Sequence, residues 1–138
     1  MLYMLLICYD PTAPQEVPRV NRQPDHAKLE GELRRAGNYV SGAGLFPVEA
    51  AKCVRKQSGE TLVTDGPFPE TKEAVGGYYI VDCEEAEAIE IAGRIAVGST
   101  SYIQVRPIAL FHPNVARIPD VEGYVDPRIP RSSVVQAE

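Results

Sequence analysis

Residues 65–73 combine residue types and spacing that could form a site for a small molecule. Gly66 and Phe68 each precede a proline and so disfavour the helical region, and the two prolines fix their own φ at about −65°. The segment should therefore be stiff and extended, with a carboxylate at Asp65 and a ring at Phe68. Ligand groups are often held by such loops on a rigid scaffold. The alternative is a plain connector between two strands.

His26 is the second candidate, because an imidazole exchanges a proton near neutral pH. It shares an apolar stripe with Leu29 and Leu33 at helical spacing, so it should face the sheet. The alternative is a structural histidine whose hydrogen bonds are made within the core. The other histidine is His112, and no Cys, His and carboxylate spacing indicates a metal site. We also find no phosphate-binding glycine loop and no G-x-S-x-G serine motif, and expect no cofactor.

Residues on the later strands are candidates for ligand binding. Tyr78 and Tyr79 are neighbours in a predicted strand and must face opposite sides; the one on the polar side could donate a hydrogen bond or stack on a ring. Arg106, on the polar face of the last predicted strand, could hold a carboxylate or phenolate through two parallel bonds. A salt bridge from Arg106 to Glu70 or Glu73 is the alternative.

Hydrophobic periodicity indicates the elements that must position these residues. Their order is strand, helix, strand, hairpin, strand, helix, strand, which is the ferredoxin-like α+β pattern with an inserted β-hairpin. Strands are predicted at 2–9, 39–46, 74–81 and 102–110, a hairpin at 51–57 and 60–64 with its turn at Ser58-Gly59, and helices from near Asn21 to Gly37 and from an Asp82/Glu85 capping box to Gly98. Gly42 and Gly44 make the second strand either a bulged edge or a platform on which a ligand could lie.

The first predicted strand is apolar on both of its alternating faces, which is typical of a central strand covered on both sides. Helices cover only one sheet face in a two-layer α+β domain, so a partner subunit is the simplest cover for the other. We assign residues 1–112 to the domain. Residues 113–138 hold four prolines and show no period, and are predicted to form an extended C-terminal arm lying on the body or on the partner.

Composition narrows the class of protein. A chain of 138 residues is one domain by size. Its net charge of −5 and pI near 5.1 argue against nucleic acid as a partner, since phosphates are neutralised by Lys and Arg. The three cysteines are far apart, which fits a reducing cytosol. With no signal peptide and no apolar run long enough to span a membrane, we expect a soluble, cytoplasmic protein.

Asp65-Gly66-Pro67-Phe68, followed by Glu70-Thr71-Lys72-Glu73 and by Gly76-Gly77-Tyr78-Tyr79, resembles the signature of DGPF-domain proteins, members of the YCII-related family. The likeness runs from the first strand to the last and stops before the C-terminal arm. It implies a ferredoxin-like domain that pairs into a dimeric α/β barrel. DGPF relatives often accompany sigma factors of the extracytoplasmic type, which implies a sensing or signalling role, and their biochemical function is mostly unassigned.

Arg22, Pro24, His26 and Leu29 resemble the Arg-Pro-x-His-x-x-x-Leu pattern of YciI-type relatives, with one extra residue before the proline. In those relatives the histidine is a proposed acid–base residue paired with an aspartate, for which this chain has no clear match. Asp65 is the hypothetical substitute: a carboxylate accepting from one ring nitrogen would leave the other as a base. Such a pair could catalyse proton abstraction, elimination or isomerisation without a cofactor. A binding or regulatory module without catalysis, and a purely structural Asp65, are the alternatives.

Overall fold

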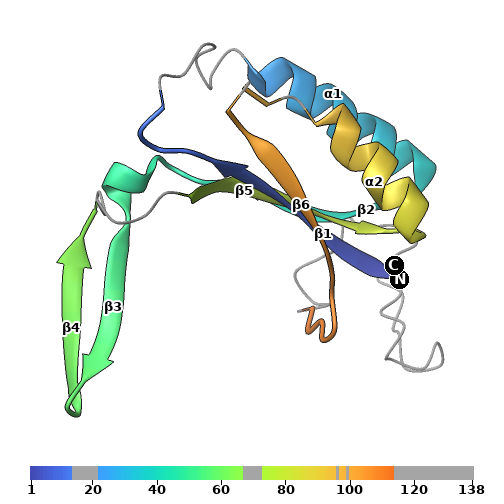
Figure 1. Cartoon of the computed structure of the whole chain (residues 1–138). Coiled ribbons are helices and arrows are strands. Elements are labelled where there is room, and N and C mark those ends of the chain that lie inside the picture. Colours follow the sequence, from blue (N-terminus) through green and yellow to red (C-terminus); the bar gives the residue numbers. More distant parts are fainter. Residues whose placement is uncertain (14–21, 67–72, 96, 99, 114–138) are drawn as a thin grey trace, which may run out of the picture.

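A computed structural model describes residues 1–13, 22–66, 73–95, 97–98 and 100–113. Its main sheet has four antiparallel strands in the order β2-β5-β1-β6, and the two helices α1 and α2 both cover one face of that sheet (Figure 1). A second sheet is a hairpin formed by β3 and β4. The predicted ferredoxin-like α+β fold with an inserted hairpin is confirmed.

Strand β1 (Leu2–Tyr9) is central, as predicted, and pairs with β5 (Ala74–Asp82) on one side and β6 (Tyr102–Pro107) on the other. Its side chains alternate between two apolar clusters. Tyr3 and Leu5 pack beneath the helices with Val81, whereas Leu2 packs on the opposite face with Val40 and Ile80. Such burial on both faces explains why this strand is apolar throughout.

Two strands end earlier than their periodicity predicted. Strand β2 is Tyr39–Gly44 and stops before the exposed Phe46, which precedes a proline. Strand β6 was expected to reach residue 110 but ends at Pro107, which has no N–H to donate to a ladder. The predicted alternation in β6 is confirmed, since Ile103 and Val105 pack against the helix-side core.

Helix α1 spans Gln23–Ala36 and presses Leu29 and Leu33 onto the sheet. Pro24 lies in its first turn, where a missing N–H costs nothing, and Gly37 ends the helix in the left-handed conformation at φ 79°, both as predicted. The expected N-cap Asn21 lies outside the described residues. Arg22 occupies the cap position, with no capping hydrogen bond from its side chain.

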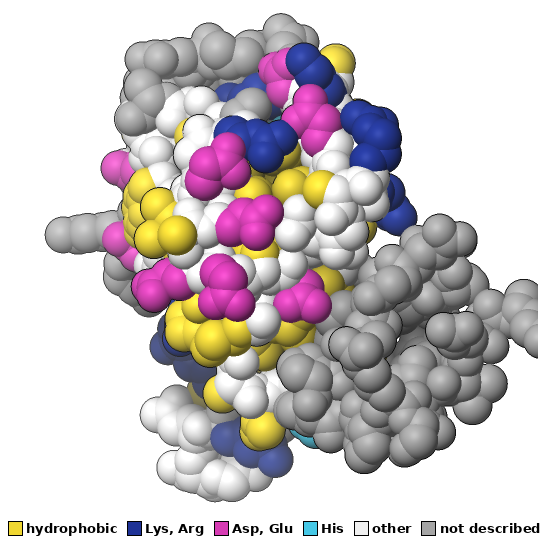
Figure 2. Space-filling model, turned by 90° about the vertical axis from the view of Figure 1, so that its right-hand side faces the viewer, with side chains coloured by type: hydrophobic (Ala, Val, Ile, Leu, Met, Phe, Trp, Pro, Cys, Tyr) yellow, Lys and Arg dark blue, Asp and Glu magenta, His cyan; other side chains and the backbone are white. Residues whose placement is uncertain are grey.

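Helix α2 spans Glu85–Arg94, and both of its predicted ends are wrong. Asp82 does not cap it, because its backbone is held in the sheet: its N–H donates to the Asn38 carbonyl and its carbonyl accepts from the Asn38 side chain. Acidic residues of the first turn, Glu85 and Glu87, favour the helix start through the dipole instead. Figure 2 views the molecule from the side on which α2 begins and shows acidic side chains gathered there.

The hairpin consists of β3 (Lys52–Gln57) and β4 (Glu60–Asp65), follows a short 3₁₀ turn (Val48–Ala50), and projects from the main sheet (Figure 1). Ser58 and Gly59 form its turn with φ 52° and 81°, as predicted. Val54 and Val63 face each other across the strands and are both exposed.

The predicted C-terminal arm lies, except for its first residue, outside the described residues. Within the described part of the chain, no helix is long and apolar enough to cross a membrane.

Candidate ligand pocket

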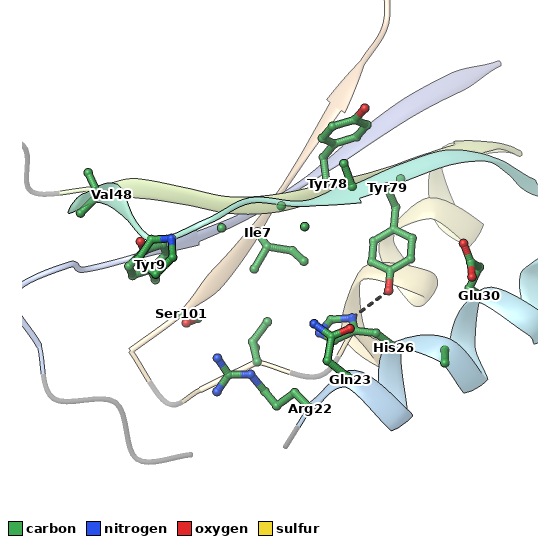
Figure 3. A pocket seen from close by; sticks show the side chains of 18 of the residues that line it. Ile7, Tyr9, Arg22, Gln23, His26, Glu30, Val48, Tyr78, Tyr79 and Ser101 are labelled. Atoms are coloured by element: carbon green, nitrogen blue, oxygen red, sulfur yellow. Dashed lines mark hydrogen bonds between the residues drawn. The ribbon is translucent and has the colours of Figure 1, made fainter. Parts of the chain in front are cut away.

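A cavity of about 600 Å³ lies between the first half of α1 and the helix-side face of the sheet (Figure 3). Its volume falls in the range of small-molecule sites, ~300–1,000 Å³. The wall mixes polar and apolar groups from α1, β1, β2, β5 and the turn before β6, including Ile7, Tyr9, Arg22, Gln23, His26, Glu30, Tyr79, Val97 and Ser101.

His26 and Tyr79 meet in this pocket. Nδ1 of His26 is 2.7 Å from the Tyr79 hydroxyl, and the two rings are stacked with centroids 6.1 Å apart (Figure 3). The first residue comes from the second turn of α1 and the second from the middle of β5, so packing of the helix on the sheet brings them together. Tyr79 is only 7% exposed, so its hydroxyl is largely shielded from bulk solvent. Both residues line the cavity, and their hydrogen bond is therefore part of its wall.

Burial and the carboxylate of Glu30 raise the pKa of Tyr79 to about 12. The phenol therefore keeps its proton at neutral pH and can donate it in a hydrogen bond. Tyr39 packs edge-on against Tyr79 at 6.5 Å, and burial together with a hydrogen bond to Glu30 raises its pKa as well. Arg34 lies 4.6 Å above the Tyr39 ring and 3.6 Å from Glu30, which holds that carboxylate at the far end of the pocket.

The sheet side of the pocket is formed largely by backbone. Gly42 is paired with Tyr79 and Gly44 with Gly77, and all three glycines line the cavity. Close approach of the strands requires glycine at position 77, because a Cβ there would lie 2.6 Å from the carbonyl oxygen of Ala43. Both Gly42 and Gly44 are exposed. The space above this backbone is partly filled, because the Tyr39 hydroxyl lies 3.0 Å from the position that a Cβ on Gly42 would take and Gly77 is buried. Strand β2 is an edge strand with a register shift between Tyr39 and Ser41, which agrees with the bulged edge that its glycines indicated.

Arg22, Gln23 and Ser101 lie at the end of the pocket away from Glu30 (Figure 3). Arg22 Nη1 is 3.6 Å, and the Ser101 hydroxyl 3.9 Å, from the position that a Cβ on Gly98 would take. The guanidinium and the hydroxyl thus converge on the turn before β6.

No group of three or more His, Cys, Asp or Glu side chains suited to a metal ion occurs among the residues described.

The family model of the YCII-related domain matches residues 1–112. The chain belongs to the YCII-related family. It is also 38% identical, over 122 residues, to an uncharacterized protein of Rhizobium meliloti (strain 1021), a match that covers 82% of this chain and 96% of that protein.

The two tyrosines of this YCII-related protein face opposite sides of the sheet, as predicted (Figure 3). Sequence analysis assigned ligand contact to whichever tyrosine faces the polar side of the sheet. In the structure Tyr79 points into the pocket, and it lies on the helix side (Figure 3). Tyr78 packs with the cluster on the open face, and Arg106 lies on that face too, because it pairs with Met4. Neither side chain can reach the space between His26 and Tyr79. No ion pair between Arg106 and Glu73 is present in the described residues, and Glu70 lies outside them.

Asp65 ends the hairpin, where its largely exposed carboxylate is paired with Lys52. The hypothetical pair of His26 and Asp65 is therefore not formed within one chain, and Tyr79 takes the place assigned to the aspartate. Phe68 and the rest of the proline-rich loop lie outside the described residues.

Several pocket residues were missed by sequence analysis, although a signal for some was present. Arg22 and Glu30 stand four residues before and after His26, so all three share one face of α1. Sequence analysis described the stripe through His26 as apolar, on the spacing of His26, Leu29 and Leu33. Tyr39 and Ser101 carry no local signal, because only the packing of distant elements brings them to the pocket.

Proposed function

We propose that this protein binds a small organic molecule in the pocket and moves a proton on it with the pair His26 and Tyr79, without a cofactor. The observation that carries the proposal is the 2.7 Å hydrogen bond between them at the wall of a cavity of ligand size. Geometry of this kind is what a general acid–base group requires.

The pair has one mobile proton. In one tautomer Nδ1–H donates to the Tyr79 oxygen and Nε2 is the basic atom; in the other, the Tyr79 hydroxyl donates to Nδ1 and Nε2 carries the proton. Because the pKa of Tyr79 is raised to about 12, the phenol stays neutral in both forms. The imidazole can therefore take a proton from a ligand carbon beside a carbonyl and return it to the same or a neighbouring atom. Such a reaction is a tautomerisation or isomerisation with no net change in protons.

Proton exchange in D₂O tests this directly. We would incubate a set of small keto acids and β-dicarbonyl compounds with the protein and follow loss of the C–H signal beside the carbonyl by proton NMR. We expect exchange faster than in buffer, a loss of about a hundredfold in His26→Ala, and no loss in His112→Ala, whose exposed ring lies outside the pocket.

Binding without exchange, with His26→Ala altering only affinity, would reject catalysis and assign the pocket to a sensing or regulatory module, the role in which association with a sigma factor is expected. We further propose that the protein acts as a cytoplasmic homodimer. The support is the second apolar cluster, in which half-buried Met4 and Tyr78 surround Leu2 and Ile80 on the face without helices.

A further inference from the structure

The charged side chains of the pocket differ between its two ends. Among the described residues, those that line the cavity are one cation, Arg22, and two carboxylates, Glu30 and Glu49. Arg22 lies at one end and Glu30 at the other, beyond Tyr79 (Figure 3). Glu49 comes from the 3₁₀ turn and is exposed, so the surrounding water weakens its field. A ligand in the cavity therefore lies between a cationic end and an anionic end.

The cationic end has the groups that bind a carboxylate. Arg22 Nη1 and the Ser101 hydroxyl both approach the same residue, Gly98, in the turn before β6. Gln23 lines the cavity beside Arg22. A guanidinium has five N–H donors, so Arg22 can bind a carboxylate through two of them and keep the contacts it already makes. The hydroxyl and the amide offer further donors at this end.

The anionic end is built around Glu30. Its carboxylate accepts a hydrogen bond from the Tyr39 hydroxyl and lies 3.6 Å from Arg34. Gly42 leaves room for Tyr39 in this position, because a Cβ at residue 42 would lie 3.0 Å from the Tyr39 hydroxyl. Two contacts from different elements therefore hold the Glu30 carboxylate at this end of the pocket.

The field of Glu30 reaches the reactive pair. Burial and, after it, the charge of Glu30 raise the pKa of Tyr79, so this end of the pocket opposes a negative charge on the phenol oxygen. A ligand carboxylate placed beside the Tyr79 hydroxyl would meet the same repulsion. The pocket therefore favours an anion at the Arg22 end and disfavours one at the Tyr79 end.

From this asymmetry we infer that the ligand class of the pocket is an oxo monocarboxylic acid, whose carboxylate is bound by Arg22 and whose ketone carbonyl lies beside His26 and Tyr79. Arg22 selects for the one carboxylate, and Glu30 selects against a second carboxylate at the opposite end. The inference rests on the proposed function, since the ketone is the group beside which the proton moves.

Three ketones with the same seven-carbon chain test the inference on the unaltered protein. They are 4-heptanone, which is neutral, 4-oxoheptanoate, which has one carboxylate, and 4-oxoheptanedioate, which has two. Isothermal titration calorimetry measures the affinity of each. We expect 4-oxoheptanoate to bind roughly tenfold more tightly than either of the others, because each comparison changes a single charged contact.

Two variants separate the ends of the pocket. Arg22→Met should reduce the affinity for 4-oxoheptanoate to that for 4-heptanone, whereas Arg35→Met, on the same helix but outside the pocket, should leave it unchanged. Glu30→Gln should raise the affinity for 4-oxoheptanedioate roughly tenfold. Glu32→Gln removes the same charge from the same helix outside the pocket and should not raise it. Circular dichroism checks that each variant is folded.

Several results would overturn the inference. They are equal affinity for the three ketones, binding of 4-oxoheptanedioate as tight as that of 4-oxoheptanoate, a preference for 4-oxoheptanoate over 4-heptanone that survives Arg22→Met, and no measurable binding of 4-oxoheptanoate. Continued exclusion of 4-oxoheptanedioate in Glu30→Gln would reject the selection assigned to Glu30.

The proposed function fails in a different way. If the neutral ketone binds as well as the acids, and His26→Ala abolishes exchange of its protons in D₂O, the proton transfer stands and only the ligand class is wrong. If 4-oxoheptanoate shows the expected preferences but His26→Ala leaves every exchange rate unchanged, the ligand class stands and the proton transfer is rejected.

Discussion

Nδ1 of His26 and the hydroxyl of Tyr79 lie 2.7 Å apart, which joins helix α1 to the strand β5 beneath it. Their hydrogen bond holds the helix on the sheet. In the proposed function the same two side chains form the reactive end of the pocket. Loss of the hydroxyl should therefore affect stability and ligand chemistry together.

Tyr79→Phe should lower the free energy of unfolding by about 1 kcal/mol, because it removes one hydrogen bond and leaves a ring nitrogen of His26 without that partner. It should also slow proton exchange on any substrate. Urea unfolding at pH 7 measures the first effect. Tyr78→Phe, one residue along the same strand but on the open face, is the matched control and should keep full exchange activity. Equal losses in both variants would reject a specific role for Tyr79.

The raised pKa of Tyr79 predicts a loss of stability at alkaline pH. Because the folded pKa of about 12 lies above the ordinary tyrosine pKa of about 10, the stabilising effect of the neutral phenol is complete below pH 10 and disappears as pH rises through 12. The loss should be on the order of 2 kcal/mol. Unfolding measured at pH 9, 10.5 and 12 should show a smaller decline in Tyr79→Phe than in the wild type. Parallel pH profiles for the two proteins would contradict the prediction.

A homodimer formed through the open face should be disrupted by a charge on that face. Leu6 lies in the centre of β1, pairs with Tyr78 and Gln104, and is only half-buried in one chain. In Leu6→Lys a charge would be buried at the interface, so light scattering should report a monomer. Ile89→Lys, at an exposed apolar position on α2, is the control and should remain dimeric. A monomeric wild type would remove the proposal of a dimer altogether.

Two glycines should respond to the same substitution with opposite sign. Gly37 has φ 79°, so Gly37→Ala strains the end of α1 and should lower the free energy of unfolding by about 1 kcal/mol. Gly93 lies within α2 with nothing within 4 Å of a new Cβ, and Gly93→Ala should raise it by a similar amount, up to about 1 kcal/mol. Thermal unfolding monitored by circular dichroism compares them. A stabilised Gly37→Ala would show that the cap conformation carries no strain.

Local signals in the sequence were sufficient for most of the fold. The doubly apolar β1, the glycine ending α1 and the Ser58-Gly59 turn were each predicted from residues close in sequence, and the structure confirms them. The start of α2 failed for a reason that no local pattern contains. Asp82 is held by Asn38, 44 residues earlier, so its capping potential is overridden by the sheet.

The candidate site was less predictable because it depends on pairing between distant elements. His26 was expected to face the sheet and does, but its partner lies 53 residues away and is set by how α1 rests on β5. The alternation of side chains along a strand required Tyr78 and Tyr79 to face opposite sides of the sheet. It did not indicate which of them lies under the helices, because both sheet faces are partly apolar.

The hairpin gives the molecule a natural attachment point. Its strands pair with each other in a sheet of their own, and its turn residues Ser58 and Gly59 stand at its outer end (Figure 1). Loop tips of this kind accept inserted sequence with little effect on the rest of a fold. A short epitope or a dye-labelling peptide inserted between these two residues would report on the protein in cells while leaving His26, Tyr79 and the pocket unmodified.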